Sequence, residues 1–169
     1  MKTTLTDNKG FTIIEIMIVI GLVMIFGSLG LVSFRTSRDT RDLTTSTQDI
    51  LSVLRLAQAR SLSGENDSVW GVRLAQNQIA LFQGPTFAGS PLVESHNLPS
   101  SLELVTITLN GGGIDVIFNR ITGTTGQNGT FVLRVTSTPT LYAPLTVDAS
   151  GVTYQTTAFS PLTSLRTVD

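Results

Sequence analysis

The fold is decided by the stretch Lys9-Gly10-Phe11-Thr12-Ile13-Ile14-Glu15 and the apolar run that follows it to Phe34. No residue from Ile16 to Phe34 is charged. At about 1.5 Å per residue, a helix over residues 11–34 is about 36 Å long, whereas the hydrocarbon core of a bilayer is about 30 Å thick. The pattern therefore predicts a membrane-spanning helix over residues 11–34.

Glu15 is the charged residue that stands just inside this apolar stretch. An ionised carboxylate at the centre of a bilayer costs about 2.5–3.5 kcal/mol on insertion scales. A residue near the end of a helix can instead reach the polar headgroups. The position of Glu15 therefore calls either for an interfacial location or for a positively charged partner.

The ten residues before the apolar run are polar and carry Lys2 and Lys9 as their cations. They do not form a secretory signal peptide, in which the apolar region precedes the cut and is removed with it. This part of the chain resembles the class III signal of the type IV pilin superfamily. The resemblance implies a prepilin leader peptide over residues 1–10, a cut between Gly10 and Phe11 by a prepilin peptidase, and N-methylation of Phe11.

The same resemblance gives Glu15 a role in assembly. Its carboxylate would pair with the new amine of Phe11 on a neighbouring subunit, so other pilin or pseudopilin subunits are the expected partners. Lys2 and Lys9 place the N-terminus in the cytoplasm by the positive-inside rule. We therefore expect a single-pass protein of the inner membrane, incorporated into a filament, with its remaining domain periplasmic or extracellular.

Composition indicates a small exported protein. A chain of 169 residues is long enough for one domain and an anchor. The formal net charge of −1 does not point to a nucleic-acid partner. Because the chain has no cysteine, neither a disulfide framework nor a thiolate metal site is possible, and we expect no cofactor.

Beyond Phe34 the sequence predicts that the helix continues over residues 35–64 as an amphipathic segment. The apolar residues Leu43, Ile50, Leu54 and Ala57 recur at helical spacing and form one stripe. The helix is expected to end near Leu62, with Gly64 in the left-handed position that follows many helices.

Residues 65–155 show the short apolar segments and frequent turns of an antiparallel β domain. Strands are expected over residues 69–74, 78–82, 102–109, 114–118, 130–135, 145–147 and 152–154. At Leu104-Val105 the apolar positions change parity, which indicates either a bulge or burial on both faces. Three prolines between Gly84 and Pro99 predict a loop there. The fold class is therefore α+β: a long N-terminal α-helix packed on an antiparallel sheet or sandwich.

Two further segments indicate which family within the superfamily the chain resembles. Ile50–Arg60 and Phe118–Thr124, together with the final hairpin, are similar to the general-secretion pseudopilin H family and its pilus counterparts. The resemblance implies a minor pseudopilin of a type II secretion system, involved in filament initiation and protein secretion. A minor pilin of a type IV pilus or competence filament is the alternative. A membrane-anchored β domain outside any filament is a third class.

The sequence does not favour an enzyme, and we expect no small-molecule substrate. His96 is the only histidine and stands in the proline-rich loop. The glycines of residues 111–113 lack the Gly-Lys-Ser/Thr of a phosphate loop. Asp115 is expected to face solvent, and Asp148 to serve a turn.

Some pilus relatives bind DNA through a basic C-terminal region, so the tail over residues 156–169 bears on this alternative. Its charged residues are Arg166 and Asp169, which leaves no excess of positive charge. We therefore expect no nucleic-acid binding. The glycine-rich segment Gly123–Gly129 is either a flexible turn or a contact with a neighbouring minor subunit or an exported substrate.

Overall fold

The computed structural model describes residues 11–156, apart from the side chains of residues 27–37. The chain forms two compact units, Met1–Arg38 and Asp39–Asp169. The expected leader over residues 1–10, and residues 157–169 of the expected tail, lie outside the described residues.

The first unit contains the beginning of the helix α1 (Ile13–Ser63). Thr12 is the residue before the helix, and its Oγ1 accepts a hydrogen bond from the backbone N–H of Glu15 at 3.3 Å. A threonine in this position satisfies one of the N–H groups that have no partner inside the helix. Among the described residues, no helix has the length and mean hydropathy of a segment that crosses a membrane.

The second unit contains the rest of α1, which buries the predicted stripe. Leu43, Ile50, Leu54 and Ala57 are all buried. The helix ends at Ser63, one residue beyond the expected end, and Gly64 follows with a φ of 65°. This left-handed conformation is the one predicted for Gly64, because a residue without a Cβ adopts it at little cost.

One sheet of the second unit has the strand order β3-β2-β1-β5, and its neighbouring strands are antiparallel. The strands are β1 (Trp70–Ala75), β2 (Gln78–Gln83), β3 (Leu92–Asn97) and β5 (Asp115–Phe118). The predicted hairpin over residues 69–82 is confirmed as β1 and β2.

The other sheet has the order β4-β6-β7-β8 and is also antiparallel. The strands are β4 (Leu102–Leu109), β6 (Gly129–Val135), β7 (Tyr142–Val147) and β8 (Thr153–Gln155). The register shifts between Val105 and Thr108, where Thr106 has a φ of 51°, so the bulge expected in this strand is present slightly later. Together with α1, the two sheets confirm the α+β fold class.

The predicted loop from Gly84 to Pro99 is wrong in its second half, because residues 92–97 form β3. This strand pairs with β2 and lies at the edge of its sheet. Most of its residues are exposed on both faces, so no alternation of apolar and polar residues marks it. Pro91 and Pro99 flank the strand instead of interrupting it.

The sequence predicts that Asp115 faces solvent, but in the structure its carboxylate is paired with Arg73. Its two carboxylate oxygens accept hydrogen bonds from Nε and Nη2 of Arg73 at 2.6 and 2.8 Å. Asp115 and Arg73 are cross-strand partners on β5 and β1. The hydrogen bonds that Arg73 donates to Asp115 raise the pKa of Arg73 above its ordinary value, so the guanidinium of this bidentate pair stays charged.

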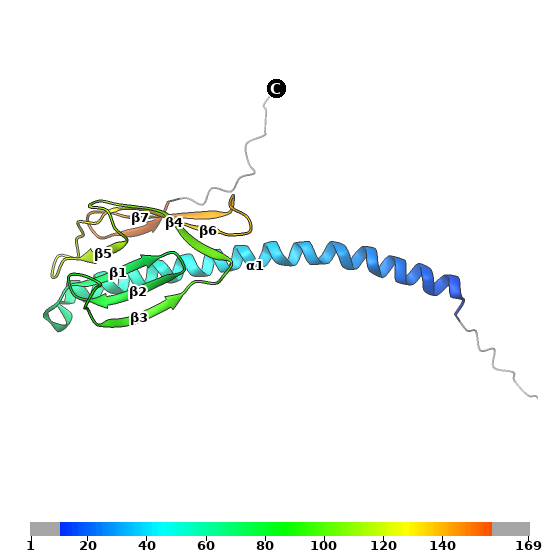
Figure 1. Ribbon diagram of the computed structural model, residues 1–169, viewed down its shortest axis with the longest axis horizontal. Helices are drawn as coiled ribbons and strands as arrows, with labels where there is room; N and C mark the ends of the chain where they lie inside the picture. The colour runs from blue at the N-terminus through cyan, green and yellow to red at the C-terminus, as the bar shows by residue number, and fades with distance from the viewer. Residues whose placement is uncertain (1–10, 157–169) are drawn as a thin grey trace, which may run out of the picture. The chain divides into compact units, whose positions relative to one another are not determined.

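The core of the second unit lies between α1 and the two sheets. Figure 1 shows β1, β2 and β3 in one layer, and β4, β6 and β7 in another. Side chains from α1 and from both sheets form one buried cluster, which includes Leu54, Trp70 and Phe131. At the end of α1, the Ser61 hydroxyl accepts the backbone N–H of Trp70 at 2.9 Å, which joins the helix to β1.

Candidate functional site

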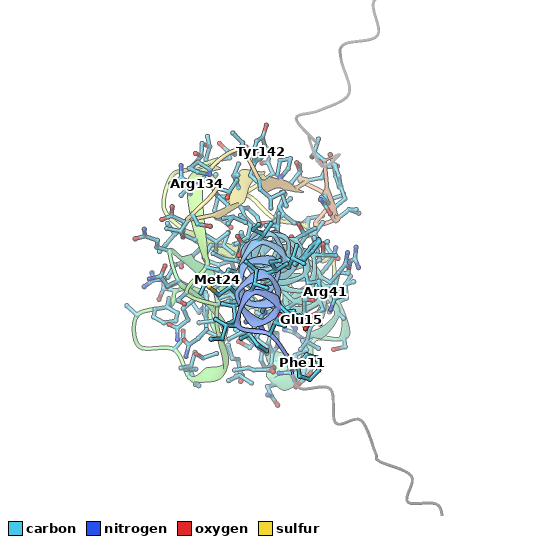
Figure 2. All side chains as sticks on the ribbon, turned by 90° about the vertical axis from the view of Figure 1, so that its right-hand side faces the viewer. Phe11, Glu15, Met24, Arg41, Arg134 and Tyr142 are labelled. Atoms are coloured by element: carbon cyan, nitrogen blue, oxygen red, sulfur yellow. The ribbon has the colours of Figure 1, made fainter. Side chains whose placement is uncertain are left out.

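The first unit exposes a continuous apolar helix surface. Phe11 is 79 % exposed and Met24 is 69 % exposed, and large apolar side chains between them are similarly uncovered. In the view along α1, Glu15 and Met24 lie on different sides of the helix (Figure 2). The exposed apolar side chains are those of Phe11, Ile13, Ile14, Ile16, Met17, Ile18, Val19, Ile20, Leu22, Val23, Met24, Ile25 and Phe26. A helix that is apolar on all sides is normally buried, either in a protein core or interface or in a membrane.

Glu15 is the charged side chain within this surface. It is exposed and lies in the first turn of α1, where a carboxylate interacts favourably with the helix dipole. Thr12 and Glu15 have the spacing of a capping box. Of the two hydrogen bonds of that motif, the one from the backbone N–H of Glu15 to the threonine hydroxyl is formed. The sequence analysis missed Thr12, although the Thr-x-x-Glu pattern before an apolar run could have identified it.

The structure brings together only part of the predicted processing site. Phe11 and Glu15 lie at the start of α1, about one helical turn apart. Lys2, Lys9 and Gly10 lie outside the described residues. The cut between Gly10 and Phe11 and the methylation of Phe11 therefore stay predictions.

In the second unit, the segment Gly123–Gly129 is held against α1 at its beginning. Gln58 Nε2 donates to the carbonyl oxygens of Gly123 and Ser150, both at 3.2 Å. The backbone N–H of Thr125 donates to the carbonyl of Ala149 at 3.0 Å. These bonds join two loops to the helix, so the first half of the segment is a packed structural element.

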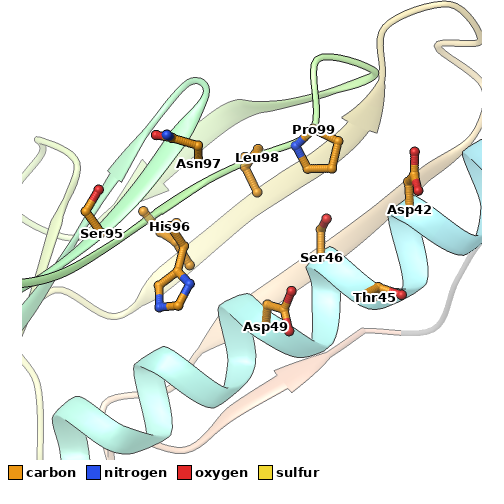
Figure 3. A pocket seen from close by; sticks show the side chains of 10 residues that line it. Asp42, Thr45, Ser46, Asp49, Ser95, His96, Asn97, Leu98 and Pro99 are labelled. Carbon is orange, nitrogen blue, oxygen red and sulfur yellow. The ribbon is translucent and has the colours of Figure 1, made fainter.

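His96 belongs to β3 rather than to a loop, and its Nε2 lies 2.9 Å from Oε1 of Glu94. It borders a pocket between β3 and α1, where Asp42 and Asp49 also lie (Figure 3). Within the part of the chain that the structure describes, no group of three His, Asp or Glu side chains could hold a metal ion.

Solved structures with a similar fold include a minor pilin and a minor pseudopilin. The type IV minor pilin FimU of Pseudomonas aeruginosa matches with a TM-score of 0.53 and 13 % identity, over 68 % of this chain and 93 % of that one. The minor pseudopilin EpsH of the Vibrio cholerae type 2 secretion system matches with a TM-score of 0.54 and 14 % identity, over 68 % of this chain and 96 % of that one. Neither a protein-family profile nor a curated protein sequence matches the chain. The chain therefore has a type IV pilin-like fold, as its first residues and its helix predict.

Proposed function

We propose that this chain is a minor subunit of a pilin-like filament, and specifically a minor pseudopilin of a type II secretion pseudopilus. The observation that carries the proposal is the exposed apolar start of α1 with the single carboxylate of Glu15 in its first turn. The pilin-like fold supports it, because the similar proteins are a type IV minor pilin and a minor pseudopilin of a type 2 secretion system. In a filament, helices of neighbouring subunits would cover this surface.

The chemistry of the proposed assembly step depends on cleavage. In the uncut chain the nitrogen of Phe11 is part of a peptide bond and carries no charge. A cut after Gly10 creates an amine there, and the Glu15 carboxylate of a second subunit is its natural counter-ion. Opposite charges about 4 Å apart attract by about 1 kcal/mol in water and by about 4 kcal/mol at an effective dielectric constant of 20. Burial of the helix therefore strengthens the pairing.

We propose that before assembly the subunit is located in the inner membrane, with residues 1–10 in the cytoplasm. Support comes from the sequence, in which residues 16–34 carry no charge and Lys2 and Lys9 precede them. The expected partners at this stage are the prepilin peptidase and sibling subunits.

A minor pilin of a type IV pilus or competence filament is the second candidate function. It is supported by the likeness to FimU, whose TM-score nearly equals that of EpsH. Loss of protein secretion in a strain that lacks the gene would favour the pseudopilus, and loss of pili or of DNA uptake would favour the alternative.

Substitution of Glu15 by glutamine tests the assembly role separately from helix capping. Glutamine can complete a capping box as glutamate does, but it carries no charge. We expect Glu15→Gln to be cut normally and to be lost from sheared filaments and from crosslinked complexes with sibling subunits. The matched control, Glu15→Asp, keeps the charge and should retain part of the incorporation.

Normal incorporation of Glu15→Gln would contradict the pairing of this carboxylate with an amine. The remaining role of Glu15 would then be that of a helix cap. A loss of incorporation that is equal in Glu15→Asp and Glu15→Gln would likewise show that charge is not the decisive property.

A further inference from the structure

The pocket between α1 and β3 is a groove of about 410 Å³ within the second unit. Figure 3 shows the helix on one side, with Asp42, Ser46 and Asp49, and the strand on the other, with Ser95 and Asn97. The helix side chains and that of His96 face this space. The side chains of Ser95 and Asn97 are directed away from it and accept hydrogen bonds from Nε2 of Gln78 at 2.7 and 3.1 Å, so these two residues border the groove with their backbone. Neither lysine nor arginine is among the residues that line it.

The strand side of the groove has an open hydrogen-bonding edge. The backbone N–H of Leu98 donates to the carbonyl of Asn77 at 2.9 Å. In an antiparallel pair, bonded residues alternate along the strand, so His96 and Glu94 bond to β2 in the same way. The N–H and C=O groups of Ser95 and Asn97 therefore point away from β2. Since β3 is the last strand of its sheet, these groups are available to another strand.

The helix side of the groove is negatively charged. Asp49 is exposed and makes no side-chain bond with the described residues, and Asp42 only accepts a hydrogen bond from Ser101 Oγ at 3.2 Å. Ser46 also lines the groove from the helix and is 4 % exposed.

We propose that this groove binds an extended, basic peptide segment of another protein, which adds to β3 as a further strand. The backbone of the segment would bond to Ser95 and Asn97, and its lysine or arginine side chains would pair with Asp42 and Asp49. These two aspartates are seven residues apart, or about 10.5 Å along the helix. Side chains on one face of a strand repeat about every 6.6 Å, so cations at alternate positions can reach both carboxylates. The proposal does not depend on the filament assignment.

The test uses the full-length protein in detergent micelles and the fluorescent peptide acetyl-Thr-Lys-Val-Lys-Val-Lys-Thr-amide. We expect saturable binding by fluorescence anisotropy, and none of comparable strength for the peptide with glutamate in place of lysine. Two further peptides carry N-methyl groups either on the lysine residues or on the valine residues. Because one of these sets of N–H groups must face β3, at least one of the two peptides should bind about tenfold more weakly.

Two variants that change the net charge equally locate the site. Asp49→Asn removes a carboxylate from the groove. Gln48→Lys adds a cation at the preceding residue, which is exposed and does not line the groove. We expect Asp49→Asn to weaken binding about threefold, the effect of one partly screened ion pair, and Gln48→Lys to change it less than twofold.

Three results would overturn the proposal. Equal binding of both N-methylated peptides and the parent would exclude strand addition. Equal weakening by Asp49→Asn and Gln48→Lys would show that only the overall charge matters. A variant that ends at Thr156 should bind as the full chain does, and a tenfold gain in affinity would instead assign the groove to residues 157–169 of this chain.

Discussion

Gly151 illustrates how a single residue joins the loops of the second unit to α1. Its φ of 83° is a left-handed value, and an added Cβ would overlap the carbonyl oxygen of Gly123 and the side-chain amide of Gln58. Gln58 is the residue that bridges the loops at Gly123 and Ser150. Glycine is therefore required at residue 151 for its conformation and for its size.

We predict that Gly151→Ala lowers the free energy of unfolding by about 2–4 kcal/mol, because strain and overlap add. Two other glycines separate the causes. Gly112 has a φ of 75° and open space around it, so Gly112→Ala should cost about 1 kcal/mol through strain alone. Gly126 has neither a positive φ nor a close neighbour, so Gly126→Ala should be nearly neutral. Urea denaturation of the three variants measures the differences, and equal effects at residues 151 and 112 would contradict the packing role of Gly151.

The sequence is least informative about residues whose partners are distant in the chain. Arg73 and Asp115 are 42 residues apart, and no local pattern indicates that β1 and β5 bring them together. Thr12 and Glu15, by contrast, are three residues apart, so their hydrogen bond could be predicted from the sequence alone.

Among the elements, those with a strong internal period were predictable and β3 was not. The stripe of α1 and the β1–β2 hairpin repeat with the periods of a helix and of a strand. In β3 both faces are largely exposed, and the strand exists because β2 offers it a hydrogen-bonding edge. Such tertiary pairing leaves no mark in the composition of the segment itself.

The pairing of β4 with β6 includes an ion pair that makes the stability of the domain depend on pH. Glu103 Oε1 accepts hydrogen bonds from Nη2 and Nε of Arg134 at 2.5 and 3.2 Å, and the two residues are cross-strand partners. The hydrogen bonds from Arg134, and then the one from Gln76, hold the pKa of Glu103 below its ordinary value. Folding therefore favours the ionised carboxylate.

For this reason, the stabilisation from Glu103 should be complete above the ordinary pKa of a glutamate. It should decline as the pH falls from there and be lost below the lower pKa of the folded state. In Glu103→Gln this contribution is absent, so its urea midpoint should differ most from that of the unmodified protein at neutral pH and converge with it in acid. Curves that stay parallel down to pH 3 would contradict the coupling.

At the scale of the whole molecule, two signals in the sequence pointed to the same fold. One is the short polar segment before an apolar run with Glu15, and the other is an amphipathic helix followed by short strands. The structure confirms the helix and the antiparallel domain, and the likeness to FimU and EpsH confirms the pilin-like fold. The choice between a pseudopilus and a pilus was not predictable, because both machines use subunits with the same fold.

The central claim is that the chain is a processed filament subunit, and the mass of its N-terminal peptide tests this claim most directly. The protein would be purified from the membrane fraction of its own host, digested and analysed by mass spectrometry. The account predicts a mature chain that begins at Phe11 with a methylated amine and lacks residues 1–10. A mature chain that still begins at Met1 would contradict it, because Glu15 would then have no new amine with which to pair.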